Sequence, residues 1–232
     1  MKLSKRFGVI WQKKHIFSVA LACCLIGAVA IIPSISTSIR PRCEYTIVID
    51  AGHGGRDGGS IGVAGSVEKE LNLAYAKTLQ KLLKKAKVNV VMTRTTDNGL
   101  YNEDANNKKL SDMRRRREII NDAQPDLVVS IHMNSFPLDS CKGAKTFYKM
   151  GSDASFDAAK NIQNSLHYYI ENASSTISSG DYYILNCTQY TSVLIECGFV
   201  SSPQEEQLLI DDNYREKFMY GVYCGIMIYL GI

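Results

Sequence analysis

Three predicted strands of this chain end in a residue that can bind a metal ion or move a proton. His53 closes the run Thr-Ile-Val-Ile-Asp-Ala-Gly-His, His132 closes Leu-Val-Val-Ser-Ile-His, and Glu196 closes Val-Leu-Ile-Glu. Ligands of open parallel sheets bind at the carboxyl ends of the strands, so these side chains are expected to meet at one edge. The sequence has 4 His, and the other two, His15 and His167, fall in the N-terminal tail and in a predicted helix. This placement favours a metal site over two unrelated structural histidines.

A catalytic metal needs at least one further ligand, because catalytic zinc usually takes three protein ligands and keeps one position open. Glu68 and Glu70 are candidates, since the glycine-rich loop at residues 52–59 carries both to the same edge. Either glutamate would also serve as a first-turn acid that complements the dipole of the following helix. The sequence pattern alone leaves the two as equal candidates. It also leaves the metal open, because histidine and carboxylate ligands suit several divalent ions.

The glycine-rich loop has a second interpretation as a phosphate cradle. Its spacing fits neither GxxxxGK[ST] nor GxGxxG, because Asp57 stands where the third glycine of the latter is required. A nucleotide site is therefore disfavoured. The low side-chain bulk around His53 instead suits close approach of a substrate backbone.

The elements that position these residues alternate between apolar strands and helices. Strands are predicted at 45–50, 88–92, 126–132, 144–149, 182–185 and 192–196. Helices are predicted at 69–87, 110–123, 156–171 and from about 203 and 213 onward. Solidly apolar strands separated by helices are typical of a parallel sheet covered on both faces. We therefore expect an α/β fold with a single three-layer domain, whose twisted, mainly parallel sheet has about six strands with helices on both faces.

A run of four arginines at residues 114–117 lies in the predicted helix 110–123. Position 116 falls within the apolar stripe of that helix. Arg116 is expected to point inward and to pair with a carboxylate, whereas the other three arginines are expected to be solvated.

Charge is divided unevenly along the chain. The sequence has 27 Lys and Arg against 23 Asp and Glu, a formal net charge of +4, and 7 of the basic residues precede Glu44, where there is no acid. The remainder carries 20 basic and 23 acidic residues, a net charge of −3. Basicity is thus a property of the tail, and nucleic acid is not an expected partner. The 45% hydrophobic and 22% charged content excludes collagen, low-complexity disorder and a polytopic membrane protein.

The tail contains an uncharged segment at residues 16–39 behind a basic flank. Its apolar part lies between a secretory core of about 7–15 residues and a bilayer span of about 20. The basic residues at 2–14 outweigh Arg40 and Arg42, so the N-terminus is expected in the cytoplasm and the domain outside. Export is the prediction, and cleavage and retention as a membrane anchor both stay open.

We divide the chain into a basic flank with a signal or anchor segment, residues 1–42, and a catalytic domain, residues 43–232.

Five cysteines fall in the domain, an odd number without paired spacing. They are Cys43, Cys141, Cys187, Cys197 and Cys224. Mostly free, buried thiols are expected.

Taken together, the motifs resemble the zinc-dependent N-acetylmuramoyl-L-alanine amidases of the type-3 group. The resemblance begins with Ile-Asp-Ala-Gly-His53-Gly-Gly and Gly65-Ser-Val-Glu68-Lys69. It continues in family order through Thr93-Arg94, Arg116 with Asn121, Ser130-Ile-His132-Met-Asn134 and Leu194-Ile-Glu196-Cys-Gly-Phe199. It spans about residues 45–209 and departs at Ser202, where the family often has Asn.

The resemblance implies one zinc ion per chain, held by His53, Glu68 and His132, which decides between the two glutamates in favour of Glu68. It implies Glu196 as the catalytic glutamate. The implied reaction is hydrolysis of the amide between N-acetylmuramic acid and L-Ala of the peptidoglycan stem peptide. Substrate-binding or supporting roles are expected for Arg94, Arg116 and Asn134.

A single catalytic domain behind one hydrophobic segment is similar to the spore-cortex, germination-type amidases. That likeness implies a role in cortex maturation through muramic-δ-lactam formation, with a peptidoglycan deacetylase in the same pathway and an accessory activator protein as a candidate partner. The implied location is the cell wall or the forespore intermembrane space. Two alternatives are a zinc peptidase that cuts within the stem peptide and a wall-binding protein without catalysis. The sequence lacks the HExxH motif that would favour the peptidase. A wall-binding protein without catalysis predicts degenerate ligand positions, whereas the ligand positions are intact here.

Overall fold

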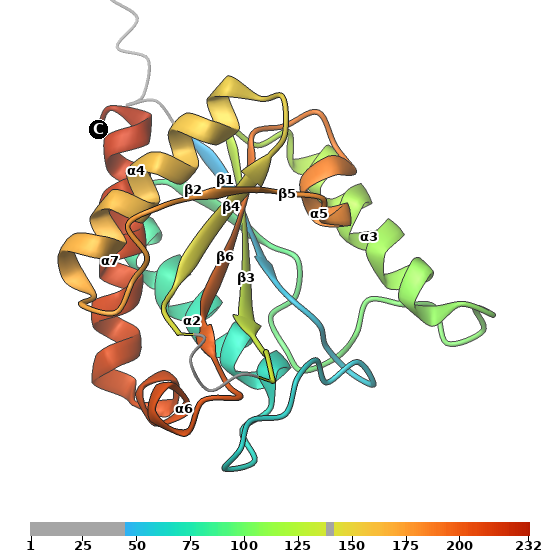
Figure 1. The fold of residues 1–232 in the computed structure, drawn as a ribbon. Coiled ribbons are helices and arrows are strands. Elements are labelled where there is room, and N and C mark those ends of the chain that lie inside the picture. Colours follow the sequence, from blue (N-terminus) through green and yellow to red (C-terminus); the bar gives the residue numbers. More distant parts are fainter. Residues whose placement is uncertain (1–44, 138–141) are drawn as a thin grey trace, which may run out of the picture. The chain divides into compact units, whose positions relative to one another are not determined.

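Six strands form one sheet at the centre of the part of the chain that the computed structural model describes, residues 45–137 and 142–232 (Figure 1). The strands are β1 (Thr46–Ala51), β2 (Asn89–Met92), β3 (Leu127–Asn134), β4 (Lys145–Lys149), β5 (Ser178–Gly180) and β6 (Ser192–Phe199). Their order across the sheet is β2-β1-β3-β6-β4-β5. Neighbours are parallel except β4 and β6, which are antiparallel. The predicted mainly parallel sheet is confirmed.

Helices cover both faces of this sheet, so the three-layer prediction is also confirmed. The helices are α2 (Glu68–Lys85), α3 (Lys108–Ala123), α4 (Asp153–Tyr169), α5 (Tyr183–Asn186), α6 (Pro203–Ile210) and α7 (Asp212–Leu230). Figure 1 shows α4 and α7 side by side on one face, with α3 and α5 on the other. Side chains alternate across a strand. Ile47 and Ile49 therefore enter the core under α2, α4 and α7, while Val48 enters the smaller core under α3 and α5.

The predicted strand at 182–185 is wrong. Residue 182 is the N-cap and residues 183–185 are the start of the short helix α5, whereas the edge strand of this region is β5, which begins four residues before the predicted strand. A short apolar run does not distinguish a buried strand from a buried helix by periodicity. Here β5 pairs with β4, and the following turn of helix packs Ile184 and Leu185 into the smaller core.

Three further predictions concern the tail and the thiols. The hydrophobic segment at residues 16–39 and the cysteines Cys43 and Cys141 lie outside the described residues. Within residues 45–137 and 142–232, no helix is long and apolar enough to cross a bilayer. The domain cysteines of this part, Cys187, Cys197 and Cys224, are free and buried or half-buried, as expected.

Helices α4 and α7 pack closely at Gly225. A Cβ added there would lie 2.4 Å from Cα of Ile162, whereas at Gly221 the nearest atom would be 3.5 Å away. We expect Gly225→Ala to lower the free energy of unfolding by about 1–3 kcal/mol, because the helices must separate. Gly221→Ala is the matched control, and its helix propensity should make it neutral or stabilising by up to about 1 kcal/mol. Urea denaturation measures both, and equal stability of the two variants would contradict the close packing.

Candidate active site

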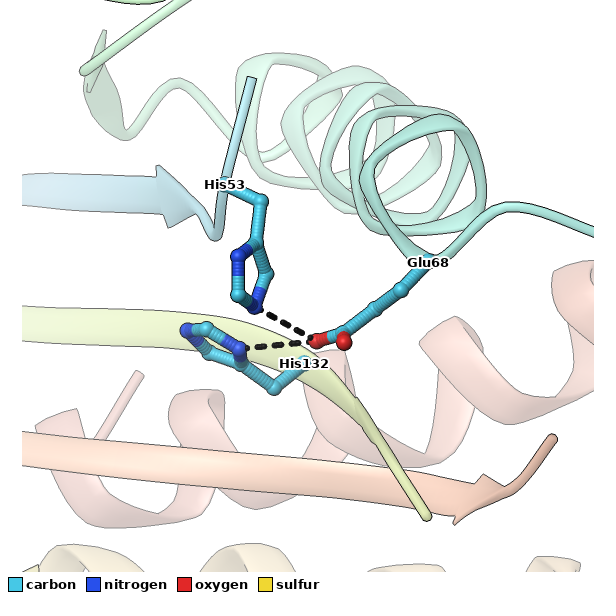
Figure 2. Close-up of side chains that lie close together, drawn as sticks. All are labelled: His53, Glu68 and His132. Atoms are coloured by element: carbon cyan, nitrogen blue, oxygen red, sulfur yellow. Dashed lines mark hydrogen bonds and ion pairs between the residues drawn. The ribbon is translucent and has the colours of Figure 1, made fainter. Parts of the chain in front are cut away.

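Glu68 lies between His53 and His132 at the carboxyl edge of the sheet (Figure 2). Its Oε1 is 3.1 Å from Nε2 of His53 and 3.0 Å from Nδ1 of His132. One ligand atom from each of the three side chains lies within 4.8 Å of the others. The structure thus brings together the three residues expected to hold a metal, from the turn after β1, the start of α2 and the strand β3.

The approach of the two histidines depends on the turn that follows β1. A Cβ at Gly52 would lie 2.3 Å from the ring of His132, so this position has no room for a side chain. His53 itself has a positive φ of 60°, a conformation uncommon outside glycine. Glycine at 52 and the left-handed turn at 53 together aim the His53 ring at the end of β3.

Glu68 is buried because it is the first residue of α2 and faces the sheet edge, whereas Glu70 is exposed. Its Oε2 accepts a hydrogen bond from the amide of Ser60 at 2.8 Å. Burial alone would raise the pKa of Glu68, but His132 and His53 outweigh it and hold that pKa well below its usual range. Of the two glutamates that the sequence pattern could not separate, Glu68 is the one that contacts both histidines.

A second carboxylate orients His53. Oδ1 of Asp57 lies 2.8 Å from Nδ1 of His53, and Lys109 pairs with the other oxygen of Asp57. Burial alone would lower the pKa of His53, but Glu68 and Asp57 together raise it. An outer carboxylate that holds one ring nitrogen is a common support for a metal-binding histidine, because it leaves the other nitrogen directed at the metal.

Glu196 faces the same space from the neighbouring strand. It lies in register with His132, since β3 and β6 are parallel and pair at these residues. Its side chain is buried, and Oε2 has no hydrogen-bond partner among the described residues. Burial raises the pKa of Glu196 above its usual range. An unpartnered buried carboxylate is costly for folding alone, and such groups are typical of functional sites.

The turn after β1 rests on the guanidinium of Arg116, which points inward as predicted. This side chain donates to Oδ1 of Asp50 at 2.6 Å, to Oδ2 of Asp112 at 2.6 Å, and to the carbonyl oxygens of Ala51 and His53 at 2.8 and 2.6 Å. Burial alone would raise the pKa of Asp50, but Arg116 and Ser130 lower it to about 2. The neighbours of Arg116 in the arginine run are exposed, as predicted.

The other two predicted supporting residues lie in different surroundings. Arg94 is buried and donates to the carbonyl oxygens of Ala51 and Gly52, both at 2.9 Å, and of Lys69 at 2.7 Å. The Arg94 guanidinium therefore supports the backbone of the turn after β1. Asn134 accepts a hydrogen bond from the amide of Ser135, and its side chain does not line the cleft.

His53, His132 and Glu196 line a cleft of about 320 Å³. Residues of α3 and α5 form its opposite wall, including Met113, Tyr182, Tyr183 and Ile184. Sequence reasoning missed this wall, because it assigned residues 182–185 to a strand. The adjacent Tyr182 and Tyr183, which precede β6, were the signal in the sequence that could have indicated this wall. The cleft thus combines an apolar wall with the two histidines of a cluster that could hold a metal ion.

Residues 47–227 match the family described as N-acetylmuramoyl-L-alanine amidase. The chain belongs to this family. It is 35% identical over 194 residues to the germination-specific N-acetylmuramoyl-L-alanine amidase of Bacillus subtilis, covering 82% of this chain and 81% of that relative. The CwlD amidase of Clostridioides difficile, solved in complex with the GerS lipoprotein, has a TM-score of 0.78 and 36% identity, covering 81% of this chain and 98% of the other.

The predicted family, fold and enzyme class of this amidase are therefore confirmed. A further likeness is to the catalytic domain of the amidase CwlV of Bacillus (Paenibacillus) polymyxa, with a TM-score of 0.72 and 29% identity over 81% of this chain and 99% of that one. The amidase cleaves the bond between N-acetylmuramic acid and L-Ala in peptidoglycan.

We expect Arg116→Met in the amidase to cost about 3–5 kcal/mol of stability, because it leaves Asp50 buried without its cation. The pKa of Asp50 is lowered on folding, so its stabilising contribution is complete above about pH 4 and is lost as pH falls towards 2. The variant should lose this acid dependence. Denaturant titrations between about pH 2 and 7 measure both effects. Arg115→Met is the control, since this exposed neighbour should change stability by less than about 1 kcal/mol.

Proposed function

We propose that this amidase uses one zinc ion held by His53, Glu68 and His132, with Glu196 as the group that moves the proton. The observation that carries the proposal is the convergence of three ligand atoms within 4.8 Å beside a buried, unpartnered carboxylate. The resemblance of these motifs to the zinc-dependent type-3 amidases supports zinc over other divalent ions.

The donor set fits zinc, which binds imidazole nitrogen and carboxylate oxygen. Oε1 of Glu68 faces both histidines, and Asp57 holds Nδ1 of His53 so that Nε2 points to the common space. With three protein ligands, one coordination position stays open for water or substrate. When bound, zinc supplies a lowered pKa for a water molecule and polarisation of the scissile carbonyl.

Glu196 performs the proton transfers in this proposal. It accepts a proton from the attacking water and donates it to the amine of L-Ala as that group leaves. Burial raises the pKa of Glu196 in the metal-free protein, and a bound dication would favour the charged form that accepts the proton. Arg116 and Arg94 act indirectly, because their hydrogen bonds hold the backbone of the turn that carries His53.

We further propose a role in spore cortex maturation, in which the amidase acts outside the cytoplasm. The germination-specific relative in Bacillus subtilis and the uncharged segment at residues 16–39 support this role. The CwlD amidase forms a complex with a lipoprotein, which supports an accessory protein here. Muramic-δ-lactam formation then requires a deacetylase acting on the same glycan. Cortex from a strain lacking this amidase should contain no muramic-δ-lactam by mass spectrometry, and a normal content would contradict the role.

The mutation Glu196→Gln should abolish turnover while zinc stays bound. Loss of the proton-transfer group is expected to lower kcat by about 10²–10⁴-fold. The measurement labels newly freed amino groups on purified peptidoglycan after incubation with the zinc-loaded, full-length enzyme and identifies the residue that bears them. Wild type should free the amine of L-Ala, and Glu70→Gln should match it because that side chain is exposed. Amines on another stem residue would indicate a peptidase, and wild-type turnover in Glu196→Gln would remove its assigned role.

Replacing a ligand should remove the metal from the folded protein. In His132→Ala we expect bound zinc, measured by atomic emission after gel filtration, to fall from about one ion per chain to a trace. His167→Ala is the matched control, because His167 lies on α4 and, among the described residues, its ring pairs with the carbonyl of Ala173 alone. Chelation should inactivate wild type, and added zinc should restore it. Retention of stoichiometric zinc by His132→Ala would show that the metal binds elsewhere.

A further inference from the structure

Helix α6 carries two consecutive buried glutamates that lie outside the catalytic cleft. Glu205 is 5% exposed and Glu206 is 0% exposed. No ion pair of residues 45–137 and 142–232 involves either carboxylate. Both stand in the first turn of α6, where the helix dipole stabilises negative charge. Their hydrogen bonds go to other segments of the chain, among them the loop before Glu68 and the end of β6, the strand that carries Glu196.

Glu206 binds the loop that leads into Glu68. Its Oε2 accepts from the amide of Ala64 at 2.6 Å, and its Oε1 accepts from the amide and hydroxyl of Ser66 at 3.0 and 2.6 Å. A Cβ at Gly62 would lie 2.0 Å from Oε1, so the loop backbone closes tightly around the carboxylate. Ser66 precedes Glu68 by only two residues. The last residues before the candidate metal ligand are therefore held by one buried carboxylate.

Glu205 fixes α6 itself to the strand that carries Glu196. Its Oε2 accepts from the amide of Phe199 at 2.8 Å, at the end of β6, and its Oε1 accepts from Gly143 and Asn172 at 2.7 and 2.6 Å. The sequence Ser202-Pro-Gln-Glu205 matches a capping box, in which Glu205 would accept from the amide of Ser202. Instead that amide donates to the carbonyl of Phe199, and Glu205 makes long-range contacts.

We propose that Glu206 is a positioning residue for metal binding, which ties the loop at residues 60–67 to α6 and thereby sets the place of Glu68 relative to Glu196. The loop has one direct backbone bond to the end of β6, from Val63 to Val200 at 3.2 Å. Without the Glu206 carboxylate, the part-buried donors of Ala64 and Ser66 lose three hydrogen bonds to α6, and the loop is free to rearrange. Such a rearrangement moves the start of α2, where Glu68 stands. The inference rests on the proposed zinc site.

The test compares the full-length variant and wild type in two properties, the affinity for zinc and the resistance of the loop at residues 60–67 to proteolysis. Glu206→Gln keeps the size of the side chain but presents an amide nitrogen to backbone donors. We expect its dissociation constant for Zn²⁺, measured against a chromophoric chelator, to rise by about 10-fold or more. Elastase, which cuts after small aliphatic residues, should cleave the metal-free variant within residues 60–67 faster than wild type. Gln207→Ala, an exposed change on the same helix, should match wild type in both measurements.

A residue that only stabilises the fold would lower the melting temperature and leave the zinc affinity of the folded protein unchanged. Wild-type affinity and wild-type elastase resistance in folded Glu206→Gln would therefore overturn the inference. If that variant does not fold, Ser66→Ala replaces it, since it removes one of the hydrogen bonds and should raise the dissociation constant less, in the same direction. If wild type itself binds no zinc, the proposed function fails, and elastase cleavage of the metal-free proteins still decides the role of Glu206.

Discussion

The buried ion pair between Asp50 and Arg116 is the interaction on which the site depends. Asp50 is the penultimate residue of β1, and the guanidinium that neutralises it also donates to the carbonyl oxygens of Ala51 and His53. One cation thereby joins α3 to β1 and holds the backbone at the point where the chain leaves the sheet. A buried pair of this kind is expensive to form and still more expensive to break. The position of His53 is thus coupled to the stability of the whole domain.

The proposed metal site is built from three short segments that meet because the strands are parallel. The turn after β1 contributes His53, the end of β3 contributes His132, and the first turn of α2 contributes Glu68. The segment that carries His53 is held by several side chains, since Arg94 and Arg116 hold the turn and Asp57 orients the imidazole of His53. A site of this design has little freedom to adjust. Rigid placement of ligands is what zinc affinity and an open fourth position require.

Burial has opposite consequences for the carboxylates around the cleft. Asp50 and Glu68 are buried beside cationic or histidine partners, which keep their pKa values low. Glu196 is buried, its Oε2 has no hydrogen-bond partner in the part of the chain that the structure describes, and burial raises its pKa. In the proposed mechanism, the low pKa values keep Asp50 and Glu68 charged as fixed parts of the site, whereas Glu196 is the carboxylate that exchanges a proton. Burial alone would raise the pKa of Glu206, but the hydroxyl of Ser66 and the amides of the loop lower it, so this carboxylate keeps its charge without a cationic partner among the described residues.

The sequence by itself determined the alternation of strands and helices, the convergence of His53, His132 and Glu196, and the inward direction of Arg116. These follow from local patterns, because apolar runs and helical periodicity report which side of an element is buried. Other features were decided only by the tertiary structure. The sequence pattern, without the family resemblance, could not choose between Glu68 and Glu70. That choice depended on where α2 begins. The helical state of Tyr183–Asn186 depended on β5 occupying the sheet edge. The contact of Glu206 with the loop before Glu68 joins residues about 140 positions apart in the sequence. Such features depend on contacts between distant segments, and neither residue propensity nor periodicity contains information about those contacts.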